Sequence, residues 1–204
     1  LRADNARGLD AVRGGGGQVD VTTGGDKPRS YDGDYQAAGK VAEEVCLRFL
    51  RHSPSVLRLE DTRALRVLQE ADVDCVLHLY DGRCLLAEIK SDRHLGVSGN
   101  VIFEVLRVNH TCESEKSCVL GWSARSPAQW LLYYAPSVQR IYVCRFANLR
   151  AAFQEYTRTV RQGTRLNWVS TDAIKSTVNV LLPWSACEAV FKVYDAETFV
   201  LVSA

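Results

Sequence analysis

Hydrophobic and polar positions in the first half of the chain predict a helix followed by a β-hairpin. Apolar residues recur at helical spacing over 37–49, and Asp34 is a suitable N-cap for this helix. Alternation with a period of two then predicts strands over 75–80 and 83–90. The dipeptide Asp81-Gly82 between them favours a tight hairpin turn, because glycine tolerates a positive φ.

Later segments predict further strands and helices around this hairpin. Ser126 and Pro127 are typical of a helix start, so 126–135 is predicted as a short helix, and 147–162 as a longer amphipathic helix. The fold class predicted from this order is mixed α/β, or α+β, with a central mixed sheet flanked by helices. Apolar and β-branched runs predict the remaining strands, over 99–108, 116–122 and 138–146.

Composition divides the chain and limits its partners. Residues 1–30 are rich in glycine and lack apolar periodicity, which predicts a flexible tail or linker before a folded domain over 31–204. The net charge of +1 is no nucleic-acid signature, so an anionic partner would have to meet a local patch. Scattered, solvated arginines are the alternative to such a patch. Its candidates are Arg93, Lys116, Arg125 and Arg140.

Cysteine usage and hydropathy indicate a cytosolic protein. Seven cysteines lie mostly in apolar runs without a C-x-x-C pair, which favours buried reduced thiols over a disulfide or a zinc site. No apolar run reaches the roughly 18 residues that a membrane span requires, and no signal peptide is visible. We therefore expect no membrane association and a cytoplasmic location.

Three charged residues stand at the rim of the predicted hairpin, where apolar residues are expected. Asp74 precedes the first strand, and Glu88 and Lys90 end the second, so all three lie near one end of the pair. Glu88 and Lys90 are two residues apart and point to the same face. An E-x-K sequence alone is commonly an exposed strand end with a local ion pair. Two carboxylates and an ammonium beside a buried strand are, however, typical of a site for a hard divalent cation such as Mg²⁺.

These residues also suggest a reaction. Carboxylates that hold a metal ion allow it to polarise a phosphate and to lower the pKa of a bound water. A lysine beside them can orient that water and offset the charge that develops on the phosphate in the transition state. The pattern therefore indicates hydrolysis of a phosphodiester.

The motif formed by Asp74 and Glu88-Ile89-Lys90, after a helix that carries acidic residues, resembles that of the PD-(D/E)XK nuclease superfamily. Its spacing is similar to that of archaeal Holliday-junction resolvases. The segments "SGNVIFEV", "GWSARSPAQWLLYYAP" and "RIYVCRFANLRAAF" are similar to a run found in small phage-type members. The resemblance covers roughly residues 34–183, and it departs from the family in having Val73 in place of the proline before the acid.

The resemblance implies a restriction-endonuclease-like core and a set of site residues. Asp74, Glu88 and Lys90 would be the catalytic residues, with Asp74, Glu88 and Ile89 at a Mg²⁺ or Mn²⁺ ion. Glu44, or Glu43 beside it, matches the acid that many members carry on their first helix. From the residues themselves, Asp72 is a further ligand candidate because it lies two positions from Asp74, and Glu104 either faces solvent or contributes to the site. Candidates for substrate binding are Arg93, His94, Asn100, Ser126 and Gln129.

The implied activity is hydrolysis of DNA in processing, repair or recombination. Its setting would be the cytoplasm of a prokaryotic cell or of a phage-infected host, with DNA as partner. A resolvase-like enzyme would also need a homodimer to cut two strands symmetrically. Two alternatives stay open: a catalytically inactive module on the same fold that binds nucleic acid or protein, and an RNA endonuclease. Against the latter, the helical stretch over 37–50 lacks the histidine that viral cap-snatching endonucleases usually carry before their acids.

Overall fold

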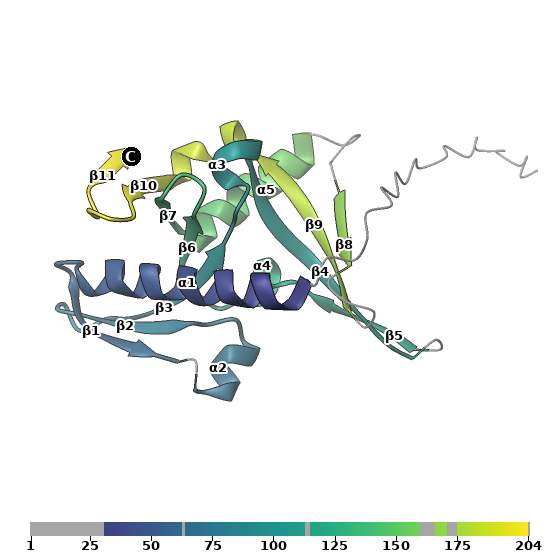
Figure 1. Ribbon diagram of the computed structural model, residues 1–204, viewed down its shortest axis with the longest axis horizontal. Helices are drawn as coiled ribbons and strands as arrows, with labels where there is room; N and C mark the ends of the chain where they lie inside the picture. Colours follow the sequence, from purple (N-terminus) through teal and green to yellow (C-terminus); the bar gives the residue numbers. More distant parts are fainter. Residues whose placement is uncertain (1–30, 63, 113–114, 160–165, 171–174, 204) are drawn as a thin grey trace, which may run out of the picture.

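The computed structural model describes residues 31–62, 64–112, 115–159, 166–170 and 175–203 (Figure 1). The tail predicted over 1–30 lies outside the described residues. The helices are α1 (Tyr31–Arg51), α2 (Arg66–Glu70), α3 (Leu95–Ser98), α4 (Trp122–Arg125) and α5 (Phe146–Thr159), with 3₁₀ turns η1 (Trp184–Ala186) and η2 (Glu188–Val190). The strands are β1 (Val56–Asp61), β2 (Cys75–Leu79), β3 (Cys84–Ser91), β4 (Asn100–Cys112), β5 (Glu115–Leu120), β6 (Trp130–Ala135), β7 (Arg140–Arg145), β8 (Leu166–Ser170), β9 (Lys175–Pro183), β10 (Phe191–Asp195) and β11 (Leu201–Ser203).

The centre of the molecule is a seven-stranded mixed sheet in the order β1-β2-β3-β6-β7-β10-β11. All neighbouring strands are antiparallel except β3 and β6, which run parallel. The predicted β2–β3 hairpin is present and Gly82 adopts a φ of 82°, but Leu79 pairs with Arg83, so the connection is the three residues 80–82 and not Asp81-Gly82 alone. The predicted fold class, a mixed sheet flanked by helices, is therefore confirmed.

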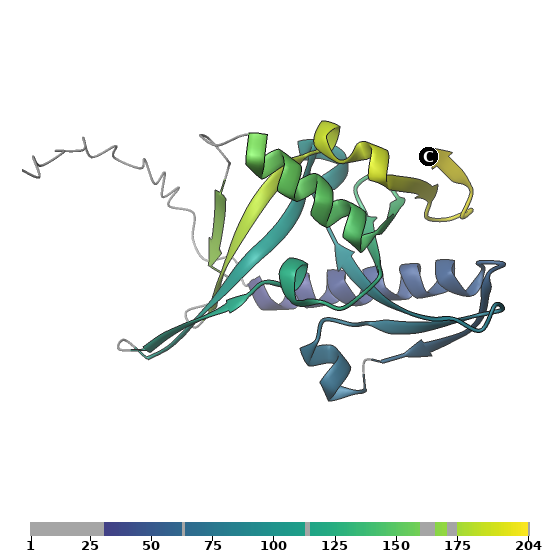
Figure 2. The same ribbon diagram turned by 180° about the vertical axis from the view of Figure 1, so that it is seen from behind.

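A second sheet was not predicted. It has four antiparallel strands in the order β5-β4-β9-β8, and the β4–β5 hairpin projects from the body of the molecule (Figures 1 and 2). The ring of Phe103 on β4 stacks on that of Phe153 on α5, with 4.2 Å between their centroids. This stacking joins the second sheet to the helix that covers the first.

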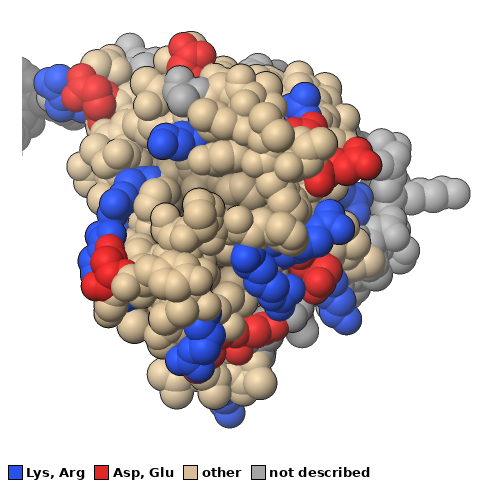
Figure 3. Space-filling view, turned by 90° about the vertical axis from the view of Figure 1, so that its left-hand side faces the viewer, with Lys and Arg blue, Asp and Glu red and all other residues tan. Residues whose placement is uncertain are grey.

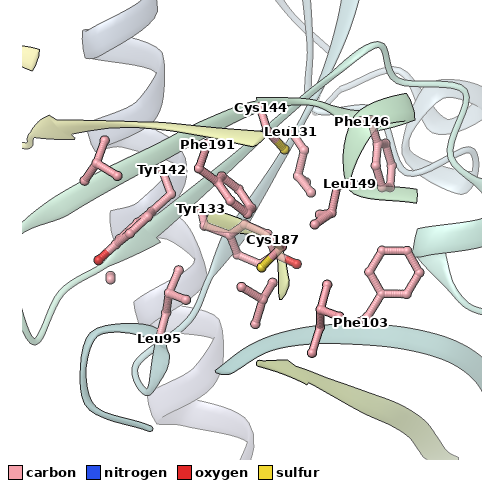
Figure 4. Close-up of a cluster of buried hydrophobic side chains, with 14 of the residues drawn as sticks. Leu95, Phe103, Leu131, Tyr133, Tyr142, Cys144, Phe146, Leu149, Cys187 and Phe191 are labelled. Atoms are coloured by element: carbon pink, nitrogen blue, oxygen red, sulfur yellow. The ribbon is translucent and has the colours of Figure 1, made fainter. Parts of the chain in front are cut away.

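Helices cover the central sheet on both faces, with α1 on one side and α5 on the other (Figures 1 and 2). The α1 face includes Ala87 and Ile89 of β3 in its core. The opposite face is filled by aromatic and aliphatic side chains from β4, β6, β7, β10 and α5, such as Tyr133 and Phe146 (Figure 4). Alternate residues of β3 therefore reach two separate cores, which decides the surroundings of Glu88 and Lys90.

The prediction of a helix over 126–135 is wrong. Residues 126–129 are not helical, and β6 begins at Trp130 between β3 and β7. Its residues from Leu131 to Ala135 are all buried, because a central strand that is covered on both faces needs apolar side chains on both sides. Periodicity alone does not separate such a run from a short helix.

The first helix is confirmed, but its predicted start is wrong. Helix α1 begins at Tyr31, so Asp34 lies inside it and is not the N-cap. Its buried residues are Ala42, Cys46, Leu47 and Leu50, whereas Val41 is exposed. None of the helices within the described ranges is long and apolar enough to cross a membrane.

The cysteines follow the predicted pattern in part. All six whose side chains the structure describes are free, and four of them, Cys46, Cys75, Cys144 and Cys187, are buried. Burial raises the pKa of the Cys75 thiol to about 12, which keeps it protonated and unreactive. Cys84 and Cys118 are exposed instead, and the side chain of Cys112 lies outside the described residues.

Candidate active site

The β2–β3 hairpin brings Asp74 and Glu88 to the same end of the sheet. Cys75 pairs with Ala87, so one position further Asp74 lies opposite Glu88. The regular pairing ends here, and Asp74 Oδ2 accepts a hydrogen bond of 2.7 Å from the backbone N–H of Ile89. The Asp74 carboxylate is thereby fixed against the strand that carries Glu88 and Lys90.

Glu88 and Lys90 form an ion pair on the face of β3 away from α1. The Glu88 side chain is only 1% exposed, while that of Lys90 is 28% exposed, and Lys90 Nζ contacts Glu88 Oε1. The other oxygen, Glu88 Oε2, is buried and has no hydrogen-bond partner among the described residues. Burial raises the pKa of Glu88 to about 8, against the lowering effect of Lys90, and the nearby charge of Asp74 raises it further.

Trp122 on α4 covers the lysine. The ammonium of Lys90 lies 5.2 Å from the centroid of a Trp122 ring, a cation–π contact. Burial acts to lower the pKa of Lys90, but the carboxylates of Glu88 and Asp74 outweigh it and raise that pKa overall. Lys90 therefore stays charged at neutral pH, between the Glu88 carboxyl group and an aromatic face.

Asp72 does not lie on an extended strand with Asp74, as the sequence interpretation assumed. Its φ is 54°, so the chain turns at this position and the rule that alternate residues share a face does not apply. Arg125 binds its carboxylate through a hydrogen bond of 2.8 Å from Nε to Oδ2 and a second contact from Nη2. The charge of Asp72 nevertheless acts on both Glu88 and Lys90, so it lies beside the site.

Glu104 is buried and does not face solvent. It lies next to an irregularity in the pairing of β4 with β9, a feature that commonly redirects a side chain. Its Oε1 lies 3.1 Å from Arg107 Nη2 and accepts a weak hydrogen bond of 3.4 Å from the backbone N–H of Trp122. Glu104 is thus linked to Lys90 through Trp122, and no direct contact with Asp74 or Glu88 is found within the described part of the chain.

Gly121 allows α4 to approach β4 closely enough for this contact. A Cβ at this position would lie 2.3 Å from the carbonyl oxygen of Glu104, which is backbone and cannot rotate away.

We expect Gly121→Ala to lower the free energy of unfolding by about 1–3 kcal/mol, as overpacking does. Urea unfolding of the variant and of wild type would measure this change in the free energy of unfolding. The control is Gly39→Ala in α1, where a Cβ meets nothing and the helix should gain up to about 1 kcal/mol. Equal stability of wild type and Gly121→Ala would refute the steric role of this glycine.

Glu44 and Glu43, the two acids predicted on the first helix, differ in how far they are exposed. The Glu44 side chain is 66% exposed and lies 4.0 Å from Arg51, a weak surface ion pair. Glu43 is half-buried. Because α1 covers the face of β3 that carries Ala87 and Ile89, it lies across the sheet from Glu88 and Lys90. Within the described residues, no hydrogen bond or ion pair joins Glu44 to the charged residues of the hairpin.

Three of the predicted substrate-binding residues lie in the segment after β3. Arg93 and His94 are exposed, and the backbone N–H of His94 donates to Asp92 Oδ1 over 2.8 Å. The Asn100 amide donates to the carbonyl of Ser98 over 2.8 Å and so closes a local turn. Only Arg93 and His94 present their side chains to solvent.

The other two predicted substrate-binding residues support the structure. Ser126 is buried, and its hydroxyl donates to the carbonyl of Asp72 over 2.7 Å. The side-chain carbonyl of Gln129 accepts the backbone N–H of Leu86 over 2.6 Å. Arg150 holds the same region from α5, because its guanidinium donates to the carbonyls of Ser123 and Ser126. These oxygens of Ser126 and Gln129 are occupied by hydrogen bonds within the protein.

Asp92 was missed by the sequence interpretation. It is buried and continues the period of two from Glu88 and Lys90, which is the signal that could have found it. Its Oδ1 accepts backbone hydrogen bonds from His94 and Leu95, whereas burial raises its pKa overall. Asp92 therefore fixes the turn that ends the strand carrying the candidate site.

The donor set suits a divalent metal ion. Asp74 and Glu88 offer two carboxylates, and the orphaned, buried Glu88 Oε2 is an oxygen that a cation would satisfy. Within the described ranges, no group of three or more His, Cys, Asp or Glu side chains is placed to hold a metal. The two carboxylates of Asp74 and Glu88 are of the kind and number that Mg²⁺ commonly binds, with waters and phosphate oxygens completing its shell. The Ile89 side chain is buried in the opposite core, so only its backbone carbonyl could be a ligand.

Comparisons with known proteins add little to this geometry. No protein-family model matches the chain, and no curated protein sequence matches it. A solved structure of a bacterial homing endonuclease, I-Ssp6803I, is similar with a TM-score of 0.43 and 14% sequence identity. The alignment covers 69% of this chain and 82% of that chain. At this low TM-score and sequence identity, the similarity concerns only the path of the backbone, and we assign no residue role from it.

Proposed function

We propose that this protein is a metal-dependent nuclease that hydrolyses phosphodiester bonds of DNA with Mg²⁺ or Mn²⁺. The observation that carries the proposal is the buried Glu88 carboxyl group opposite Asp74, which has one oxygen on Lys90 and the other without a hydrogen-bond partner among the described residues. Leaving a carboxylate oxygen buried and unsatisfied is costly unless the site serves a further ligand. DNA as the substrate follows the resemblance of this motif to PD-(D/E)XK nucleases.

Asp74, Glu88 and Lys90 would have different roles in this reaction. Asp74 and Glu88 would hold the metal, and the hydrogen bond from the Ile89 N–H to Asp74 keeps the first carboxylate oriented for it. The bound metal would polarise the scissile phosphate as a Lewis acid. Lys90 is charged, partly exposed and fixed by Glu88 and Trp122, so its ammonium can orient water and stabilise negative charge on the phosphate.

Labelled single-stranded, duplex and four-way-junction DNA, each with Mg²⁺, with Mn²⁺ or with EDTA, test the proposal. We expect cleavage of at least one DNA form that requires the metal and stops with EDTA. The DNA form that is cut fastest would identify the substrate. RNA strands of the same sequence test whether the activity is specific for DNA.

Two results would contradict the proposal. Binding of DNA without cleavage under any metal condition would favour the catalytically inactive binding module. Cleavage of the RNA strands alone would favour the RNA endonuclease.

A further inference from the structure

A cavity lies across the central sheet from Glu88 and Lys90, beneath the last turn of α1. Its volume is about 260 Å³, and side chains from α1, β2, β3, β6 and β7 line it. Most of this lining is apolar, with Leu50, Leu77, Leu79, Leu85, Trp130 and Leu132 as its main contributors.

Three cationic residues belong to the same lining, and no acidic residue does among the residues that the structure describes. They are Arg83, Arg145 and Lys192, all exposed. Arg83 contacts Asp81 next to the hairpin turn, and Arg145 lies 4.7 Å above the Trp130 ring. Within the described ranges, no carboxylate pairs with Arg145 or Lys192. Figure 3 views the molecule from the end where α1 terminates; blue Lys and Arg side chains, several with red Asp or Glu side chains beside them, lie on this mainly uncharged face.

We propose that this cavity binds a small amphipathic anion, a monocarboxylate with an alkyl or aryl body. An apolar cavity of about 150 Å³ holds benzene, so the present one has room for a somewhat larger apolar body. Arg145 and Lys192 would meet the carboxylate at the rim, where a charge-assisted hydrogen bond is stronger than a neutral one. The Ser53 and Ser55 residues in the lining offer few polar groups for an uncharged polar ligand.

The charge arrangement is the reason for choosing an anion over a neutral apolar ligand. Arg145 and Lys192, which pair with no carboxylate in the described part of the chain, lie beside an apolar hollow; this favours a ligand that brings one negative charge and disfavours a cation. The site is separate from the proposed nuclease site, since the sheet lies between them. The inference does not depend on that activity.

Isothermal titration calorimetry of the full chain with octanoate, octan-1-ol and octylammonium tests the site. We expect octanoate to bind at least about tenfold more tightly than either analogue, the scale of one hydrogen bond to a charged group. Arg145→Gln combined with Lys192→Gln should remove this preference and leave the affinity for octan-1-ol within about twofold. Lys40→Gln is the matched control, because Lys40 is exposed on α1 and does not line the cavity.

A filling variant tests the cavity itself. Val143→Phe places a ring in the hollow and should abolish octanoate binding, with circular dichroism to show that the variant folds. If it does not fold, Leu85→Phe is the replacement. Absence of octanoate binding to folded wild type would overturn the proposal. So would equal affinity for octanoate and octan-1-ol, or octanoate binding that neither the basic pair nor the filling variant weakens.

Discussion

Glu88→Gln is expected to abolish metal-dependent DNA cleavage, with a loss of at least about a hundredfold, the scale on which one preorganised electrostatic contact acts. The amide keeps the shape of the side chain but removes the charge that a divalent cation needs. Mg²⁺ affinity, measured by calorimetry, should fall together with the cleavage rate. Lys90→Met should lose cleavage to a similar extent and retain Mg²⁺ binding, because an ammonium is not a metal ligand.

Glu70→Gln is the matched control for this loss. Glu70 lies on α2, its side chain is 62% exposed, and it pairs with Arg66, so removing its charge should leave cleavage unchanged. Circular dichroism of each variant separates loss of activity from loss of fold. If Glu88→Gln and Lys90→Met both cut DNA at the rate of wild type, the charged residues of the hairpin are structural.

The metal-free protein is expected to become less stable as the pH rises from about 4.5 to about 8. The pKa of Glu88 is raised from 4.5 to about 8 by burial, so the folded state keeps a proton that the unfolded chain releases. The contribution of this group is therefore complete below pH 4.5 and is lost as the pH rises through 8. One pKa unit corresponds to about 1.4 kcal/mol, so the loss amounts to a few kcal/mol.

Urea unfolding at several pH values in EDTA measures this loss. Glu88→Gln should flatten most of the slope and leave the part that comes from buried Asp92, whose pKa is raised in the same direction. Adding Mg²⁺ should restore stability at pH 8 more than at pH 5, because the ion binds the ionised carboxylate. An unfolding free energy that is independent of pH in this range would contradict the protonated state of Glu88.

Local sequence was sufficient for the hairpin and for its charged residues. The period of two placed Glu88 and Lys90 on one face, with Asp74 near the same end of the pair. A turn of three residues instead of two then sets the register that brings Asp74 opposite Glu88. It was also sufficient for α5 and for β4, whose patterns are long. It failed for β6, where a strand buried on both faces has the same apolar run as a short helix.

Contacts between distant segments could not be predicted. Asp72 was expected beside Asp74 on one strand, but the chain turns at Asp72 and Arg125 binds it. Gln129 was a candidate for substrate binding, and nothing in the sequence indicated that its side-chain carbonyl accepts a backbone N–H of β3. Trp122, which covers Lys90, gave no signal that separates it from any other core tryptophan.

The sequence by itself determined the hairpin, its charged rim and the chemistry that two carboxylates and a lysine can carry out. These features depend on backbone periodicity and on side-chain type, which are local properties. Only the tertiary structure decided that Glu88 is buried with one oxygen that no described residue bonds, that α1 covers the opposite face and that Arg83, Arg145 and Lys192 line one cavity. Burial, pKa and cavities arise from the packing of segments that are far apart in the chain, and no short stretch of sequence contains them.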